Sequence, residues 1–399
     1  NTAVGKDSLL ANTTGAQNTA VGTSALKANI ASCNTAIGTN ALLCNTTASS
    51  NTAVGFCSLA LNTTGFSNTA IGKNSLSANT TGTSNTAIGI ISLCANTTGA
   101  SNTALGRSAL AANTTASYTT AVGFCSLKSN TTGSANNAFG AFSLLNNTTG
   151  KANVAIGGCN VGSYGASLES NTTGCCNVAV GTGALRNNTT ANNNTAVGTI
   201  ALINNTTGTE NVAVGANALD ANTTAVANTA VGFNALSANI TGTANTAVGR
   251  QALRSVTDHD NNTAIGMNAG YNNTGANNTY IGRSAALCGT SGDDNVSVGH
   301  NSMCRLTTGA ENTTVGKGAL LDITTGAYNV AVGVSALANN TTGIYNVAVG
   351  RRTGESVTTG QNNILLGREA GIAGSPFTVT TQDNRVVIGD NAITNAYVR

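Results

Sequence analysis

The stretch from Asn51 to Ser67 reads N-T-A-V-G-F-C-S-L-A-L-N-T-T-G-F-S, and variants of it fill the chain. Its opening motif begins at Asn1 and occurs in 23 copies, the last of which we place at Asn384. Of the 22 intervals between copies, 18 are 17 residues long, two are 16, one is 24 and one is 21. One unit can be written N-T-A-V-G-x-x-A-L-x-x-N-T-T-G-x-x, and its positions are numbered here as slots 1 to 17. A fixed period of this kind indicates a repeat architecture.

The length and composition of the unit predict an all-β fold. Seventeen residues are too few for a pair of helices, whereas the repeated Val, Ile and Thr favour strands. Gly, Asn and Ser are typical of corners. We therefore expect a parallel β-solenoid or β-roll of about 23 coils, in which each coil stacks on the next through strand hydrogen bonds.

Slot 5 is glycine in every copy, from Gly5 to Gly389. A glycine that no other residue replaces indicates a backbone demand, either a positive φ or a lack of room for a Cβ atom. We therefore predict structural glycines at slot 5, and those of the first five copies are Gly5, Gly22, Gly38, Gly55 and Gly72.

Slots 3 and 4 are both apolar, as in Ala3 and Val4. Successive side chains of a strand point to opposite faces, so a strand that is apolar on both faces is buried on both. One face can fill the thin interior of the roll, and the other needs a partner. The simplest partner is another copy of the chain, so we expect a parallel homotrimer with slot-4 side chains or their slot-3 neighbours facing the partner chains.

Slot 12 is usually Asn but becomes Leu306, Ile323 and Val357 in copies that keep the T-T-G after it. A slot that exchanges Asn for aliphatic residues is predicted to be interior, with the Asn side chains stacked in a ladder. Fourteen of these asparagines also lie in N-x-T sequons and would accept N-glycans in a eukaryotic setting if they were exposed. The exchange favours the ladder over the glycan acceptors, which include Asn12, Asn45, Asn62, Asn130, Asn205 and Asn340.

The chain offers little for catalysis or for binding charged partners. Strongly charged residues make up 8% of it, there are two histidines, and the formal net charge is +3. No motif of a nucleophile, metal site or phosphate loop occurs, and no apolar run reaches the roughly 20 residues of a membrane span. His259 lies between Asp258 and Asp260 and could hold a cation, although a solvated loop is the favoured interpretation. We therefore predict no enzyme activity, no catalytic, metal or cofactor-binding residues, no nucleic-acid partner and no membrane insertion.

The ten cysteines are scattered over several slots and form no C-x-x-C pair. They fit either small apolar fillers or occasional staples in an oxidising, extracellular setting. The best candidate disulfide joins Cys288 at slot 11 of one coil to Cys304 at slot 10 of the next. Stacked strands lie about 4.8 Å apart, within the usual Cα window of a disulfide. The one-slot offset requires a local bend, which Gly289 could provide.

Two stretches interrupt the period. The coil at 153–176 is seven residues longer than the others, and its extra residues are expected to form an outward loop with Tyr164 as the candidate contact residue. The stretch from Gly371 to Asp383 adds four residues and holds the only proline, Pro376. We therefore predict a repetitive shaft at 1–370 and a C-terminal transition segment at 371–399.

The N-T-A-[VI]-G motif resembles the S-x-A-I-G repeats in the head domains of trimeric autotransporter adhesins. That resemblance implies a left-handed parallel β-roll packed as a trimer. The fuller unit, which runs on to N-T-T-G, resembles the shaft repeats of viral tail and surface fibres that precede an endosialidase-type intramolecular chaperone. The segment from Asp383 to Arg399 resembles the stretch before such a chaperone, which would then be missing or cleaved.

These resemblances imply the shaft of an extracellular homotrimeric fibre on a virion surface. Such a shaft supports attachment to a host-surface glycan or receptor. One alternative is a bacterial surface adhesin or filament. Another is a solenoid that binds a ligand itself, either a glycan or ice, but the paired T-x-T array typical of ice-binding solenoids is missing from the unit.

Overall fold

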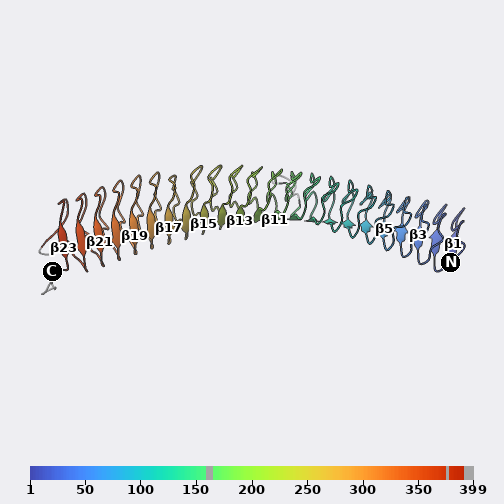
Figure 1. Ribbon diagram of the computed structural model, residues 1–399, viewed down its shortest axis with the longest axis horizontal. Coiled ribbons are helices and arrows are strands. Elements are labelled where there is room, and N and C mark those ends of the chain that lie inside the picture. Colours follow the sequence, from blue (N-terminus) through green and yellow to red (C-terminus); the bar gives the residue numbers. More distant parts are fainter. Residues whose placement is uncertain (159–164, 374–376, 391–399) are drawn as a thin grey trace. The chain divides into compact units, whose positions relative to one another are not determined.

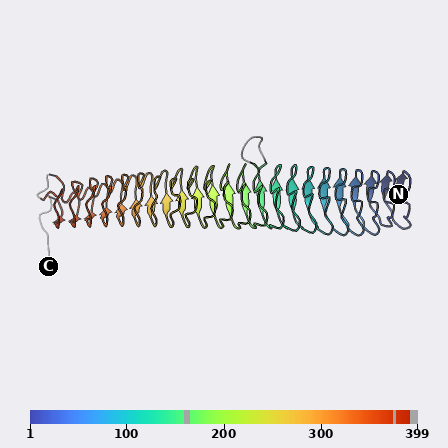
Figure 2. The ribbon, with the colours of Figure 1, turned by 90° about the horizontal axis from the view of Figure 1, so that it is seen from above.

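The computed structural model describes residues 1–158, 165–373 and 377–390, and it divides into two compact units, Asn1–Thr207 and Gly208–Arg399. In each unit, short strands follow one another in chain order (Figure 1, Figure 2). The described residues of both units form strands, turns and bends and contain no helix.

Every strand is three residues long and occupies slots 2 to 4 of its coil. The strands of the first unit are β1 Thr2–Val4, β2 Thr19–Val21, β3 Thr35–Ile37, β4 Thr52–Val54, β5 Thr69–Ile71, β6 Thr86–Ile88, β7 Thr103–Leu105, β8 Thr120–Val122, β9 Asn137–Phe139, β10 Val154–Ile156, β11 Val178–Val180 and β12 Thr195–Val197. The strands of the second unit are β13 Val212–Val214, β14 Thr229–Val231, β15 Thr246–Val248, β16 Thr263–Ile265, β17 Thr279–Ile281, β18 Val296–Val298, β19 Thr313–Val315, β20 Val330–Val332, β21 Val347–Val349, β22 Ile364–Leu366 and β23 Val386–Ile388.

Neighbouring strands within a unit are parallel and pair equal slots, so that Ala3 of β1 stands beside Ala20 of β2. Outside the strand, each coil consists of turns and bends that bond to the next coil. Leu9 N–H, for example, donates to Ala25 O at 3.1 Å, and Ala11 N–H donates to Lys27 O at 3.0 Å. The predicted parallel β-solenoid with a 17-residue repeat is therefore confirmed, with one strand in each coil.

The interior is narrow and is filled mainly by small and medium side chains. After the first coil, the slot-3 alanines and the slot-9 leucines are buried, and Ala70 and Leu76 are fully buried. The slot-4 side chain of the same strand points away from this interior, since Ile71 is 38% exposed. The structure thus decides between the two faces, with slot 3 inside the coil and slot 4 outside it.

Two columns of buried asparagines, at slots 1 and 12, satisfy each other and the backbone. At slot 12, Asn79 Nδ2 donates to Asn62 Oδ1 of the preceding coil at 2.8 Å and to Gly82 O at 2.9 Å. At slot 1, Asn85 N–H donates to Asn68 Oδ1 at 3.0 Å. The predicted interior position of slot 12 is confirmed, and the aliphatic residues Leu306, Ile323 and Val357 are equally buried there.

Slot 5 meets both demands that a glycine-only position can make. Gly72 has φ +131°, and an ideal Cβ on it would lie 2.5 Å from Gly89 O of the next coil. The five predicted glycines, from Gly5 to Gly72, all combine a φ near +130° with such a backbone contact. Slot 5 therefore combines a positive φ with a close backbone contact to the next coil, and no side chain fits there.

Slots 7, 9 and 17 adopt the left-handed backbone region without being reserved for glycine. Asn74, Leu76 and Ser84 of one coil have φ of 56°, 51° and 57°. Asn tolerates this region, whereas Leu is disfavoured there. Because Leu76 is fully buried and its N–H donates to Ser92 O at 3.0 Å, packing and coil-to-coil bonding offset the backbone cost.

In the second unit, a large side chain in one coil is matched by a missing side chain in the coil before it. Tyr280 replaces the usual slot-3 alanine of β17, and Gly270 replaces the usual slot-9 leucine one coil earlier. A Cβ on Gly270 would lie 2.6 Å from Tyr280 Cδ2, so the phenol ring fills the space that a leucine would occupy. Tyr280 is fully buried, and its hydroxyl donates to Asn273 Oδ1 at 3.2 Å.

The structure corrects the start of the last coil. Strand β23 pairs Val386 with Ile364, and Arg385 N–H donates to Asn363 Oδ1 as slot-1 residues do. Slot 1 is therefore Arg385, 22 residues after Asn363, and Asn384 stands at slot 17 of the coil before it. The interruption adds five residues rather than four, and Pro376 within it lies outside the described residues.

Coil stacking also continues beyond the boundary predicted at residue 371. Strand β23 pairs in parallel with β22, and Gly389 N–H donates to Leu366 O at 2.6 Å. The described part of 371–399 thus keeps the solenoid pairing as far as Gly389. A transition to another fold after that point stays a prediction.

Candidate interaction surfaces

The slot-4 side chains form an apolar ladder, aliphatic except for Phe139, on the outer face of the strands in each unit. All of them are half-buried or exposed. The exposed members of the first unit are Val4, Ile37, Ile71, Leu105, Phe139, Ile156 and Val197. Those of the second unit are Val214, Ile265, Ile281, Val315, Val349 and Ile388.

Slot 2, on the same outer face, adds to this ladder in part of the second unit. Threonine is replaced there by aliphatic residues, of which Val296, Ile364 and Val386 are exposed. The outer face then carries two apolar side chains in one coil. An apolar surface repeated at this regularity indicates an interaction site rather than scattered surface residues.

The candidate N-glycan acceptors do not offer their side chains to solvent. Asn45, Asn62, Asn130, Asn205 and Asn340 are fully buried, and Asn12 is half-buried. Asn62 Nδ2, which would carry a glycan, instead donates to Asn45 Oδ1 at 2.8 Å and to Gly65 O at 2.8 Å. The structure favours the interior ladder over the glycan acceptors.

Threonines at slots 13 and 14 form a corner with a single outward column. The slot-13 hydroxyl bonds to the next coil, as when Thr63 Oγ1 donates to Thr80 O at 3.0 Å. The slot-14 residue, such as Thr64, is exposed. Each such coil thus presents one fully outward threonine at this corner.

Cys288 and Cys304 are neighbours but are not bonded through sulfur. Cys288 N–H donates to Cys304 O at 3.0 Å, which places the two residues on stacked coils as predicted. Both are free thiols in the structure, so the predicted bridge is not formed in it. Partial burial raises the pKa of the Cys304 thiol, and the nearby Cys288 thiol raises it further. Pairing under oxidising conditions stays a prediction.

The other described cysteines differ in burial. Cys125 is buried and fits the interpretation as an apolar filler, whereas Cys33 and Cys176 are exposed. Cys159 and the candidate contact residue Tyr164 lie outside the described residues, so the predicted role of that loop is not addressed by the structure.

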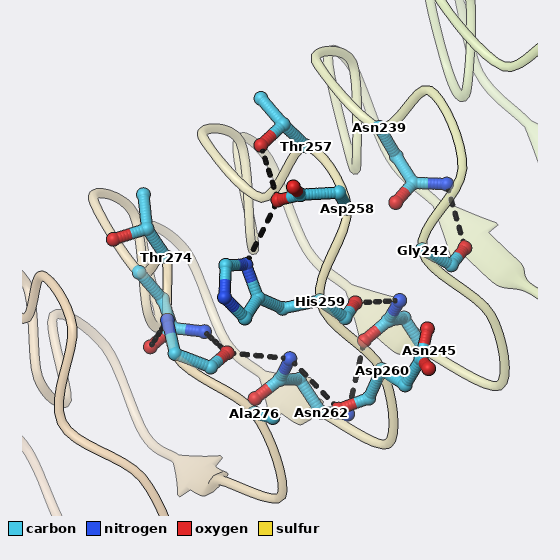
Figure 3. A network of polar contacts seen from close by, with 12 residues as sticks. Asn239, Gly242, Asn245, Thr257, Asp258, His259, Asp260, Asn262, Thr274 and Ala276 are labelled. Atoms are coloured by element: carbon cyan, nitrogen blue, oxygen red, sulfur yellow. Dashed lines mark hydrogen bonds and ion pairs between the residues drawn. The ribbon is translucent and has the colours of Figure 1, made fainter.

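His259 does not gather the two flanking carboxylates around its ring. Its Nδ1 lies 3.0 Å from Asp258 Oδ1, which also accepts a hydrogen bond from Thr257 Oγ1 at 2.8 Å (Figure 3). Asp260 Oδ1 instead accepts Thr243 N–H at 2.6 Å. The two carboxylates thus have different partners, and His259 O accepts Asn245 Nδ2 at 2.8 Å where a glycine carbonyl usually does.

A polar groove of about 490 Å³ crosses three coils of the second unit. Seven residues line it, and they come from slots 7, 10 and 11: Asn217, Asp220, Asn234, Ser237, Ala238, Arg254 and Ser255. Sequence reasoning missed this groove because slots 7 and 10 lie in turns, where no alternation rule predicts which side chains share a face. The available signal was the run of polar residues at both slots in consecutive copies.

Other kinds of site are not found in the part of the chain that the structure describes. No three His, Cys, Asp or Glu side chains gather as a metal site would require, and no helix there could cross a membrane. A hollow of about 590 Å³ is lined by eight residues: Phe377, Thr378, Val379, Gln382, Asn384, Arg385, Val386 and Val387.

The chain was compared with protein-family models, with curated proteins and with solved structures, and no comparison gave a match.

Proposed function

We propose that the chain is the shaft of an extracellular, parallel homotrimeric fibre that supports attachment to a host or another surface. The observation that carries this proposal is the outward slot-4 ladder of each unit. Aliphatic side chains in every coil would be an aggregation liability on a free surface, and they lose contact with water when a partner covers them.

The regularity of the ladder points to a second copy as the partner. Each coil rises by the strand spacing of about 4.8 Å, so a surface that interdigitates with the ladder needs the same axial repeat. A parallel copy of the chain has that repeat by construction. Three copies around a common axis bury the ladder on every chain, and the resemblance to adhesin and fibre repeats implies a left-handed roll in this arrangement.

The interior fits a mechanical role. Buried asparagines link consecutive coils by hydrogen bonds such as that from Asn96 Nδ2 to Asn79 Oδ1 at 2.8 Å. Each coil is thereby tied to the next inside as well as at the strand. A stalk that holds an attachment site away from a virion or cell surface needs such connected coils, and it needs no catalytic residues.

Sedimentation equilibrium of the whole chain tests the proposal. We expect a mass of three chains over a wide concentration range. Electron microscopy of the native source should show fibres projecting from a particle or a cell. A folded, stable monomer with the slot-4 face open to solvent would contradict the proposal.

A further inference from the structure

The polar groove of the second unit arises where four consecutive coils depart together from the usual unit. Slot 7 carries an amide side chain in each of them, and slot 10 carries an acid, a hydroxyl, a base and a phenol in turn. The slot-7 residues are Asn217, Asn234, Gln251 and Asn268, and the slot-10 residues are Asp220, Ser237, Arg254 and Tyr271.

The lining of the groove offers both donors and acceptors in a small space. Asn217 and Asn234 carry amides that donate and accept, Ser237 carries a hydroxyl, and Asp220 carries a carboxylate that accepts. Asn234 Oδ1 is buried and accepts no hydrogen bond from the described residues, which costs free energy. The groove therefore suits a ligand that is dense in hydroxyl groups.

The two charged residues stand at opposite ends of the groove. Asp220 and Arg254 are two coils apart, about 10 Å along the stack, which is the length of a disaccharide. Arg254 is held in place because its guanidinium donates to Tyr271 Oη and lies 5.4 Å from the centre of that ring. Asp220 is half-buried, and its carboxylate can accept hydrogen bonds from ligand hydroxyls.

The same lining disfavours other ligands. A divalent cation would find a single carboxylate in this groove and a fixed guanidinium two coils away, which is a poor oxygen cage. An apolar ligand would find no large aliphatic or aromatic residue among the seven that line it. One negative and one positive end match a ligand without net charge.

We propose that this groove binds one or two residues of an uncharged oligosaccharide. Asp220 and Ser237 accept hydrogen bonds from its hydroxyl groups, and the amides of Asn217 and Asn234 donate to and accept from the same sugar. The inference rests on the proposed attachment role and deepens it, because it makes the shaft itself a glycan-binding surface. Vicinal hydroxyls of a sugar can donate to a carboxylate and accept from an amide at the same time, so they match this mixed lining.

Saturation-transfer NMR of the whole chain with maltotriose, cellotriose, mannotriose and N-acetylchitotriose tests this. We expect at least one of these sugars to bind. The Asp220→Asn variant keeps the shape of the side chain and removes its charge, and it should weaken that binding by about tenfold or more. Asn234→Ala should also weaken the sugar binding.

A matched control uses the same two slots in the first unit. The Asn74→Ala/Ser77→Ala variant alters slots 7 and 10 of a coil that has no acid at slot 10 on either side, and it should leave sugar binding unchanged. Circular dichroism of every variant checks that the fold is kept. Binding that is equal in all variants, binding that requires added calcium, or no binding of any of the four sugars would overturn the proposal.

Sugar binding and oligomeric mass together distinguish the proposed sugar site from the proposed trimeric shaft. A three-chain assembly that binds none of the sugars would overturn the groove and leave the shaft standing. A monomer whose sugar binding depends on Asp220 would overturn the trimeric shaft and leave the groove standing.

Discussion

At the scale of single residues, the repeat tolerates a large change only where a neighbour changes with it. Tyr280 fits because Gly270 leaves room for its ring, and burial raises the pKa of the Tyr280 phenol, with the Asp293 carboxylate raising it further. The phenol therefore stays protonated and continues to donate to Asn273. The pair thus behaves as one packing element shared between two coils.

A double-mutant cycle tests this coupling. Tyr280→Ala should cost roughly 3 to 5 kcal/mol because it opens a cavity and removes the hydroxyl contact. Gly270→Leu alone should also destabilise the coil, since its Cβ would lie 2.6 Å from Tyr280 Cδ2. The double variant restores the usual alanine and leucine, so it should recover most of the loss. Denaturant unfolding and hydrogen exchange of these coils measure the effect, and strictly additive losses would contradict the coupling.

Asp220 gives a second prediction, on pH. Burial raises the pKa of Asp220 above its ordinary value of 3.8, although hydrogen bonds from backbone N–H groups of Asp220 and Ala221 lower it in part. The folded state then holds the proton more tightly than the unfolded state, so stability falls as pH rises from about 3.8 through the raised pKa. Asp220→Asn should therefore melt above the wild type at neutral pH and lose this advantage below pH 3.8. Ser237→Ala, which has no titratable group, should show no such crossover in thermal melts.

At the scale of the coil, the backbone corner at slot 5 matters more than any side chain. Slot 5 combines a positive φ with close backbone contact between consecutive coils, while slots 7, 9 and 17 take a left-handed conformation without that contact. Glycine is therefore required at one of these positions and optional at the others. Gly318, at slot 7, has φ +63°, and an ideal Cβ there would have no neighbour closer than Ser335 Oγ at 3.9 Å.

Two alanine substitutions separate contact from conformation. Gly72→Ala should cost at least about 3 kcal/mol because its Cβ would lie 2.5 Å from Gly89 O, which is backbone and cannot rotate away. Gly318→Ala should cost only about 1 kcal/mol, which is the cost of a left-handed alanine. Thermal unfolding of the two variants measures the loss of stability in each. Equal losses of stability would show that the positive φ alone accounts for the requirement for glycine.

Some features of the coil can be predicted from the sequence, and others cannot. The glycine at slot 5 and the interior asparagine at slot 12 were predictable, because comparing the copies reveals which positions tolerate exchange. The left-handed Leu76 was not, because closing a 17-residue coil overrides the local preference of leucine. The last register was also misplaced, because Asn384 matches the motif by type, whereas the strand pairing selects Arg385. The groove depends on how turns fold back, which neither strand nor helix periodicity describes.

At the scale of the whole molecule, assembly should depend on the outer face and not on the interior. We expect glutamate at Ile88, Leu105 and Val122 together to prevent trimer formation while the single chain still folds. These slot-4 side chains point outward, and burying three unpaired carboxylates in an interface is costly. Sedimentation should then show a smaller mass with an unchanged circular dichroism spectrum.

The control for that experiment uses a different face of the same coils. Thr98, Thr115 and Thr132 occupy the exposed slot-14 corner, and glutamate at all three should leave the mass at three chains. A trimer that persists with glutamates at slot 4 would place the interface elsewhere, and an unfolded chain would mean that slot 4 supports the coil itself.

The in-register stacking has a consequence for how such a gene can change. Because Thr2 stands beside Thr19 and Ala3 beside Ala20, every coil offers its successor the same set of bonding partners that it received from its predecessor. Duplicating or deleting one whole unit therefore recreates an existing junction between coils. Unequal recombination can thus lengthen or shorten the protein without passing through a variant that fails to fold. Coils that share the Tyr280 and Gly270 exchange are the exception, since they can be copied or lost only as a set.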